Sequence, residues 1–466
     1  MPDRFTDYDD DVRQLVLDFE ATILKGQTQF FDVDELEVII DYYLEVNDRE
    51  PLQAAVEYAE RLYPDSSSIR LRRAHLLIVD NRYDEALQMM LDLRQREPDD
   101  TDVLYSLGVA YGAVGKSDEA IRCYLAASAD GWELGRIYTN IAEEYFKQAN
   151  YAKSADYYQK ALLTDSYDSG TLYGYLEVME IQGAMHDAVD RFQHFLMDHP
   201  YHKDAWYCLG RSCQSIGLYE RAVDAFEYAI AIDRHFLSAY EELSCCFELQ
   251  GRLGEAASAL ARMLEVDSQR SYVYRQLGAL YARADKLETA LMYFRSAVET
   301  DPADASAISQ MAICYLHLND IPMAVSTVKQ AMRVDPENAE ALFSAALVSD
   351  AMGHTEKASE YFDRLIVGGN YTEQHCRLYT SFLYHHDLLD VMIPFAEESL
   401  DMYPHSTFYS TYLAAAYYRS NRYNKARSRM LDAHVPLLLE LCPSIGENPL
   451  FVDVLQAAEQ QQNTLK

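Results

Sequence analysis

The segment of this 466-residue sequence that most suggests nucleotide chemistry is GAVGKS, at positions 112–117. A phosphate-binding loop needs Gly-x4-Gly-Lys-Ser/Thr after a strand, so that backbone N–H groups surround the phosphates. Here Ala110 stands at the position of the first glycine. The segment is also typical of a bend between two helices, since Gly115 is matched by Gly217, 102 positions later. We therefore expect a bend and no nucleotide site.

Histidines are the next residues whose spacing invites comparison with a metal site. His194, His199 and His202 straddle a helix end, but no cysteine or pair of acids completes a tetrahedral set nearby. His385 and His386 are adjacent, so they point to different faces of a helix. We expect solvated turns and surface side chains here, with no metal and no cofactor.

Eight cysteines are scattered along the chain, and Cys208, Cys213, Cys245 and Cys246 lie near one another in sequence. A reactive thiolate needs cations held at a fixed position. Arg211 is nearby, but nothing in the sequence fixes its geometry, so reduced thiols that pack as small apolar residues are expected. No catalytic triad, carboxylate pair or dinucleotide loop accompanies them. We predict that the chain is not an enzyme.

The elements that carry these residues are helices repeated at a fixed interval. In Lys203–Arg234, the residues Trp206, Leu209, Gly210 and Cys213 fall at i, i+3, i+4 and i+7, which is one stripe of a helix. A second stripe follows the turn, and both stripes return 34 residues up and down the chain. The downstream copy contains Tyr274, Leu277, Gly278, Tyr281, Ala290, Phe294, Ala297 and Pro302.

This pattern resembles the tetratricopeptide repeat, whose signature is W-x2-L-G-x2-Y…A-x3-F…P with a period of about 34 residues. Twelve repeats in unbroken phase account for 408 of the 466 residues. The resemblance implies an all-α, right-handed solenoid superhelix of about twelve helix hairpins, in which stacking buries the apolar faces. The repeats begin at Val33, Ser67, Thr101, Gly135, Ser169, Lys203, Leu237, Ser271, Ala305, Ala339, Glu373 and Thr407.

Three segments are expected on this basis. Residues 1–32 hold a frayed start and a capping helix at Asp9–Lys25. Residues 33–440 hold the twelve tandem repeats. Residues 441–466 hold a loop and a capping helix at Leu450–Gln460.

Two repeats are expected to depart from regular helix positions. Close approach of the two helices of a hairpin needs small side chains at their contact. Leu52 and Met392 occupy the second-helix position that is alanine in nine repeats. We therefore expect irregular packing in the first repeat and in the repeat that begins at Glu373.

Charge limits the class of partner. The chain has 75 acidic and 40 basic residues, for a formal net charge of −35. Such a surface repels nucleic acid and anionic lipid, so we expect protein or peptide partners and no nucleic acid. No apolar run approaches the roughly 18 residues that a spanning helix needs. The acidic start MPDRFTDYDDD lacks a signal-peptide core, so we expect no membrane insertion and a cytoplasmic location.

In the tetratricopeptide family, certain first-helix positions line the concave face, and here they hold aromatic and arginine residues. Tyrosine offers rigid contact area and a hydroxyl, which suits peptide capture. The alternative for the tyrosines is packing against the next repeat. The candidate peptide-binding residues are Tyr105, Tyr173, Tyr207, Arg211, Tyr272, Arg275, Arg283, Phe343, Arg377, Tyr384 and Arg419.

The groove charges differ between the two ends of the array. Asp34, Glu37, Asp41 and Glu45 form an acidic rim in the first repeat. The arginines after Ser271 predict a positive floor that would bind carboxylates. The alternative is that these arginines neutralise neighbouring acids.

A specialised clamp of the family holds a terminal carboxylate with Lys and Asn residues from three repeats. Arg136 and Asn140 occur here, but Tyr105 and Val109 replace the Lys and Asn before them, so a chaperone-tail clamp is not expected. The resemblance implies a non-catalytic scaffold that binds an extended peptide or partner protein in its concave groove. A self-associating assembly element, or a regulatory or sensor subunit of an enzyme or signalling complex, stays open, as does monomer or dimer.

Overall fold

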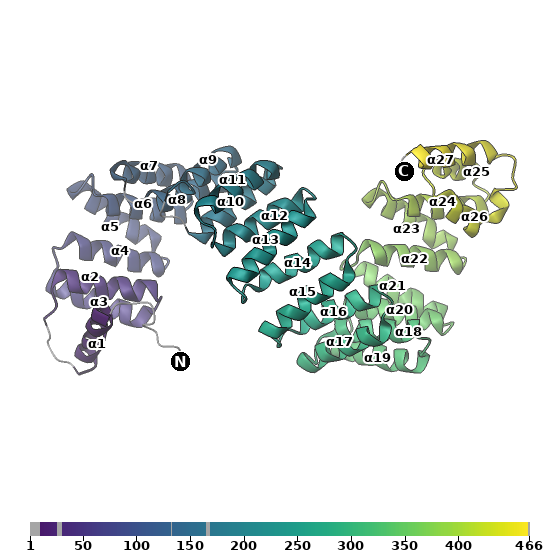
Figure 1. The fold of residues 1–466 in the computed structure, drawn as a ribbon, viewed down its shortest axis with the longest axis horizontal. Helices are drawn as coiled ribbons and strands as arrows, with labels where there is room; N and C mark the ends of the chain where they lie inside the picture. The colour runs from purple at the N-terminus through teal and green to yellow at the C-terminus, as the bar shows by residue number, and fades with distance from the viewer. Residues whose placement is uncertain (1–9, 26–29, 132, 165–167, 465–466) are drawn as a thin grey trace. The chain divides into compact units, whose positions relative to one another are not determined.

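The computed structural model describes residues 10–25, 30–131, 133–164 and 168–464. All regular secondary structure within these ranges is helical (Figure 1). The all-α repeat fold predicted from the sequence is therefore confirmed. The chain divides into two compact units, Met1–Cys246 and Phe247–Lys466, which we describe separately as unit 1 and unit 2.

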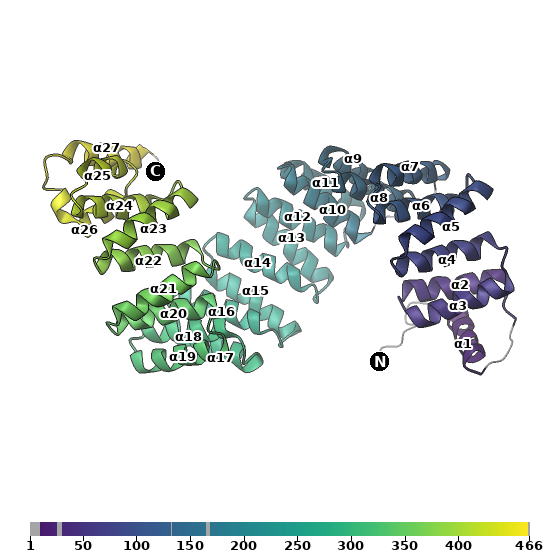
Figure 2. The same cartoon turned by 180° about the vertical axis from the view of Figure 1, so that it is seen from behind.

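Unit 1 stacks consecutive helices as hairpins, each laid beside the next (Figures 1 and 2). Its helices are α1 (Asp10–Lys25), α2 (Val33–Glu45), α3 (Arg49–Leu62), α4 (Ser67–Val79), α5 (Tyr83–Arg96), α6 (Thr101–Ala113), α7 (Ser117–Ala127), the short 3₁₀ helix η1 (Ser128–Asp130), α8 (Leu134–Lys147), α9 (Tyr151–Ala161), α10 (Ser169–Ile181), α11 (Met185–Asp198), α12 (Lys203–Ser215) and α13 (Tyr219–Ile232). The division between the units falls within α14 (Leu237–Leu249).

Unit 2 is built in the same way from the remaining hairpins. Its helices are α15 (Leu253–Val266), α16 (Ser271–Arg283), α17 (Leu287–Thr300), α18 (Ala305–His317), α19 (Ile321–Val334), α20 (Ala339–Ala351), α21 (Thr355–Val367), α22 (Glu373–His385), α23 (Leu389–Met402), α24 (Thr407–Arg419), α25 (Tyr423–Met430), α26 (Val435–Leu441), the 3₁₀ helix η2 (Pro443–Ile445) and α27 (Val452–Thr464).

The bend inside every hairpin uses the same backbone conformation. One residue of each bend has a φ between +53° and +76°, in the left-handed region that L-residues other than Asn and Asp seldom adopt. The sequence supplies Gly, Asn or Asp at this position in all repeats but one, where Ala149 has a φ of +56°. The bend residues are Asn47, Asn81, Gly115, Ala149, Gly183, Gly217, Gly251, Asp285, Asn319, Gly353, Asp387 and Asn421.

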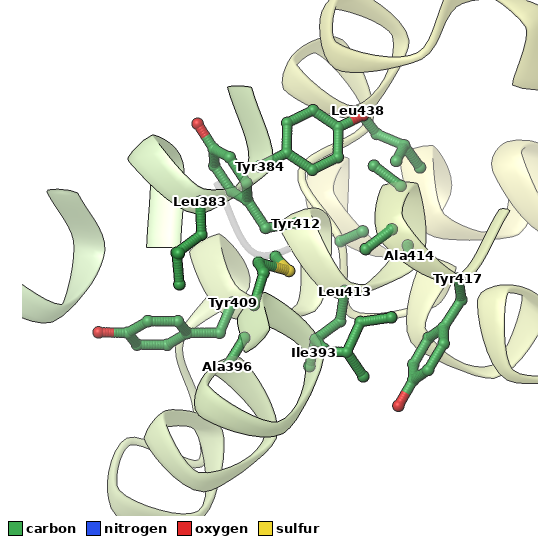
Figure 3. Packing of buried hydrophobic residues seen from close by; sticks show 14 of the residues in the cluster. Leu383, Tyr384, Ile393, Ala396, Tyr409, Tyr412, Leu413, Ala414, Tyr417 and Leu438 are labelled. Atoms are coloured by element: carbon green, nitrogen blue, oxygen red, sulfur yellow. The ribbon is translucent and has the colours of Figure 1, made fainter. Parts of the chain in front are cut away.

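The two repeats with a large residue at the small position both form hairpins, α2–α3 and α22–α23. Leu52 and Met392 are buried in the cores of their units. In unit 2 the core continues into α24 and α26, where Leu413 and Leu438 join it (Figure 3).

The last repeat differs from the expected hairpin because its second helix is broken. α25 ends at Met430, and α26 begins at Val435. Pro436 lies in the first turn of α26, where its missing N–H is tolerated. Inside a helix that continued from α25 it could not donate to the Asp432 carbonyl and its ring would clash with it, so α25 does not run on into α26. The His434 N–H instead donates to Thr411 Oγ1 at 2.8 Å, and His434 Nδ1 accepts from the Leu437 N–H at 3.3 Å.

Candidate functional site

A cavity of about 420 Å³ opens between the first helices of unit 1. It is lined by α2, α4, α6 and α8, so successive repeats each contribute side chains through the same helix of the hairpin. Its wall combines apolar residues, among them Leu44, Ile78 and Val109, with charged and aromatic ones. Of the predicted peptide-binding residues, Tyr105 lines it.

Arg72 lines the cavity and is already paired with acidic side chains. Arg72 on α4 contacts Asp41 of the preceding repeat through Nε at 3.0 Å and Nη2 at 2.5 Å. Nη2 also lies 3.3 Å from Glu37 Oε2. A guanidinium held by two carboxylates has little capacity left to bind an anionic ligand.

His75 lies behind this pair, and its imidazole is neutral at pH 7. Its Nε2 lies 2.7 Å from Ser106 Oγ of the next repeat. Burial, with a smaller contribution from the Arg72 charge, lowers the pKa of His75 to about 4. The His75–Ser106 contact therefore links two repeats as a neutral hydrogen bond.

Two residues of the next repeat, Asn140 and Arg136, contact Tyr105. The Asn140 amide donates to the Tyr105 hydroxyl at 2.9 Å. The Arg136 guanidinium lies 5.0 Å from the ring centroid, a cation–π distance. Arg136 is itself paired with Glu133 at 3.3 Å. The result is a rigid aromatic surface at the cavity edge.

Asp102 is the acid at the cavity rim that lacks a partner. Among the described residues, no hydrogen bond or ion pair engages its carboxylate. Desolvation, followed by the nearby charge of Asp100, raises the pKa of Asp102, whereas Arg72 opposes the shift. A carboxylate in such surroundings gains most from an incoming cation.

A second group of predicted residues lies on α10 and α12. The Tyr173 hydroxyl donates to Asp204 Oδ1 at 2.6 Å. Tyr207 is 9% exposed, because the rings of Phe226 and Phe236 lie 5.7 and 5.2 Å from it. Much of the tyrosine contact area expected in the groove is thus used for packing between repeats.

The predicted arginines are paired with acids wherever they occur. Arg211 lies 3.2 Å from Glu242 in unit 1. In unit 2 the partners are Asp304 for Arg275, Glu248 for Arg283, Glu373 for Arg377 and Asp387 for Arg419. The structure therefore shows local charge neutralisation at each predicted arginine.

Three predicted aromatic residues of unit 2 also have partners within the chain. Tyr272 lies beside Arg270. Phe343 is 5% exposed and lies 4.5 Å from the His375 ring. Tyr384 is 3% exposed, because α24 covers it with Tyr412 at 5.4 Å and its hydroxyl donates to the Leu441 carbonyl at 3.1 Å (Figure 3). Phe343 and Tyr384 are core residues and not an open floor.

Asp102, His75 and Ser106 are not among the residues predicted from the sequence, which are aromatic residues and arginines, with acids in the first repeat. The available signal was that all three lie on the first helices of two consecutive repeats, His75 on α4 and the other two on α6 with Tyr105. Whether these residues line one cavity depends on the volumes of the surrounding side chains, which the 34-residue spacing does not specify.

The other segments with suggestive chemistry are structural. Gly112 lies in the last turn of α6, and Ser117 is the first residue of α7. GAVGKS therefore spans the bend between two helices. Within the described ranges, no group of three or more His, Cys, Asp or Glu residues is arranged to hold a metal ion. In those same ranges no helix has the length and apolar character needed to cross a membrane.

Comparison with solved structures returns several proteins of low sequence identity. Yeast Tom70 is 16% identical, with a TM-score of 0.46, and covers 92% of this chain and 96% of its own. PilF of Pseudomonas aeruginosa is 18% identical, with a TM-score of 0.35, and covers 44% of this chain and 94% of its own. YrrB, described as a TPR protein with an unusual peptide-binding site, is 21% identical, with a TM-score of 0.31, and covers 39% of this chain and 93% of its own. No curated protein sequence matches significantly.

Two family models, each described as tetratricopeptide repeat, match residues 71–128 and 135–167. These matches lie inside the array of hairpins, and the hairpins continue in the same phase on both sides of them. The chain therefore contains tetratricopeptide repeats.

Proposed function

We propose that the chain is a protein-interaction scaffold that binds an extended segment of a partner protein on the first helices of unit 1. The segment places one lysine or arginine side chain in the cavity, beside Asp102. The observation that carries this proposal is the cavity itself, which has an unpaired carboxylate at its rim and a fixed aromatic surface at its edge.

The charges around the cavity favour a cationic side chain. Arg72 is outnumbered by Asp41 and Glu37, and Arg136 is balanced by Glu133. Among the residues that the structure describes, Asp102 is the cavity carboxylate with no cation paired to it. A lysine or arginine gains a charge-assisted hydrogen bond there, whereas a glutamate meets three acids.

The apolar side chains that line the cavity favour contact with the methylene groups of the same lysine or arginine. Leu71, Ile78 and Val109 line the cavity below the charged rim. Lysine and arginine bury their methylene stems against apolar surface and keep the charged end at a polar site. The Tyr105 ring adds a flat contact for a guanidinium or for the peptide backbone.

A positional peptide library on the full chain tests this function. Acetylated peptides of about eight residues, each with one fixed and otherwise mixed positions, are measured by fluorescence polarisation. We expect Lys or Arg to be selected at one position, with affinity reduced about tenfold in Asp102→Asn, since a charge-assisted hydrogen bond contributes about 1.5–3 kcal/mol.

The matched control is Asp99→Asn, which removes an exposed acid near Asp102 that does not line the cavity. Its affinity should stay within twofold. Selection of Asp or Glu, or equal losses in the two variants, would contradict the basic-residue pocket. Absence of any selected peptide would reject the peptide-binding function itself.

A further inference from the structure

The last turn of the second helix holds an exposed apolar residue in three repeats. Leu163, Met197 and Val367 stand at the same repeat position and are 73%, 68% and 88% exposed. A large apolar residue at a position that is otherwise mostly polar or small indicates a contact surface. The other repeats hold Arg61, Gln95, Ala129, Ala231, Glu265, Glu299, Arg333, Asp401 and Val435 there, and Val435 is buried.

Each of these three residues lines a hollow on the second-helix side of its unit. In unit 1, a hollow of about 830 Å³ lies between α9 and α11, with Leu163 at its edge and Tyr175 and Met179 of α10 among its lining residues. A second hollow of about 490 Å³ includes Met197 and Trp206. In unit 2, Val367 lines a hollow of about 690 Å³.

The two hollows of unit 1 form one continuous surface, because Asp190 and His194 line both. We call this surface the second-helix groove. α9 ends at Ala161, three residues earlier in its repeat than α11, so Leu163 stands beyond the last helical turn. The α10 residues that line the hollow, Tyr175 and Met179, are 4% and 5% exposed.

The rim of the second-helix groove is acidic. Asp156, Asp187 and Asp190 line the larger hollow. Arg191 is the cation beside them, and it contacts the Gln159 side chain. A ligand that buries its apolar side chains here therefore meets carboxylates on either side and gains from basic residues that flank its apolar face.

The groove also constrains the backbone of its occupant. Its walls are helices whose backbone groups are already bonded within each helix, so they offer no edge to an extended strand. An occupant that buries its backbone here must satisfy its own N–H and C=O groups, as a helix does. The extended segment proposed for the first-helix cavity inserts one side chain only and keeps its backbone in water. We propose that the second-helix groove of unit 1 binds an amphipathic helix of a partner protein, with apolar residues in the hollows and lysines or arginines against the acidic rim.

This site is independent of the cavity proposed for the extended segment. The cavity lies on first helices, whereas Leu163, Met197, Asp187 and Asp190 belong to the second-helix side. The two sites would let one repeat array hold two partners. A second copy of this chain fits the groove poorly, because its net charge of −35 would bring acid against acid.

The test uses a fluorescent Leu/Lys amphipathic peptide of about 18 residues, five helical turns, titrated with the full chain. A companion peptide has Glu for every Lys. We expect the Leu/Lys peptide to bind and the Leu/Glu peptide not to bind. Leu163→Ser combined with Met197→Ser should weaken binding about tenfold, since apolar burial is lost without a change of charge.

The matched control is Met292→Ser, which changes a 63% exposed methionine of unit 2 that lines none of these hollows. It should leave affinity within twofold. No binding of the Leu/Lys peptide, or equal effects of the serine variants, would overturn the proposal.

The charge of the rim is tested separately from the total charge. Asp156→Asn, Asp187→Asn and Asp190→Asn together should weaken the Leu/Lys peptide, whereas Glu265→Gln, Glu288→Gln and Glu299→Gln in unit 2 should not. Equal weakening by both sets would show non-specific attraction and reject the site. Sedimentation that shows a dimer lost in the Leu163→Ser/Met197→Ser variant would assign the groove to a second copy and also overturn the proposal.

Discussion

Gly210 on α12 lies directly against the ring of Phe226 on α13. A Cβ built on Gly210 would stand 2.5 Å from Cε1 of Phe226, closer than two carbon atoms approach without displacement. The same relation joins Gly278 to Phe294, where the distance would be 2.6 Å. At these two hairpins the absence of a side chain on the first helix leaves room for the buried aromatic ring.

Replacing Gly210 by alanine should lower the free energy of unfolding by about 1–3 kcal/mol, because the added methyl overpacks a filled contact. Chemical denaturation followed by circular dichroism measures the change. Gly254→Ala is the control, since a Cβ at Gly254 meets nothing within 4 Å. It should stabilise by up to about 1 kcal/mol through helix propensity. Equal destabilisation of both variants would show that the contact with Phe226 is unimportant.

Ala149→Gly should stabilise the chain by about 1 kcal/mol. Ala149 has a φ of +56°, where its Cβ is strained and glycine is not. The converse change, Gly217→Ala, places a Cβ at a bend with a φ of +75° and should destabilise by about the same amount. Thermal unfolding of both variants checks the prediction. A lower melting temperature for Ala149→Gly would contradict it.

The buried His75 should make unfolding depend on pH between about 6.5 and 4. The pKa of His75 is about 4 in the folded chain, whereas its ordinary pKa is 6.5, so in this window the unfolded chain binds a proton that the folded chain does not. Stability from His75 is therefore present above pH 6.5 and is lost as pH falls, by about 2 kcal/mol at pH 5. Urea denaturation at pH 7 and pH 5 measures the loss.

His75→Gln is the control for that measurement, because glutamine can still bond Ser106 but does not titrate. The difference between the two pH values should shrink by about 2 kcal/mol in this variant. An unchanged difference would show that His75 does not sense pH. Arg72 and Asp41 face the same cavity and are unchanged in the comparison.

Asp204 should be more important for stability than its position at the start of α12 suggests. It accepts from the Tyr173 hydroxyl at 2.6 Å and from Ser169 Oγ at 2.9 Å, both on the preceding first helix. Asp204→Ala leaves these donors unpaired and should cost about 1–3 kcal/mol. A double-mutant cycle with Tyr173→Phe should give a coupling energy of about 1 kcal/mol or more. Strict additivity would contradict the inferred bond.

Helix positions were largely predictable from the sequence, because each hairpin repeats the same apolar spacing and ends in a residue suited to its bend. The first helix of the fourth repeat begins at Leu134, one residue before the expected Gly135. The failure at the end of α25 has a local cause in Pro436, which the repeat phase alone does not register. The repeat spacing thus predicts the helix positions except where a local signal such as Pro436 interrupts a helix.

The residues of the first-helix groove were less predictable, because the exposure of each side chain depends on which side chains of the neighbouring repeat cover it. Tyr207 and Tyr384 occupy the expected helix face, yet Phe236 and Tyr412 cover them. Leu163 and Met197 can be recognised in the sequence, since they are large apolar residues at a repeat position that is otherwise mostly polar or small. Only the structure shows that hollows lie beside them.

The shared left-handed residue of the hairpin bends has a consequence for how such a chain can change length. The bend residues of different repeats have similar φ values, for example +59° at both Asn81 and Asn319. Two copies of the array could therefore be joined at this residue without a change in its backbone conformation. Duplication or loss of a whole 34-residue module therefore requires no new corner in the chain. A deletion that is not a whole number of repeats would place a different residue at the bend, where a positive φ is strained for most side chains.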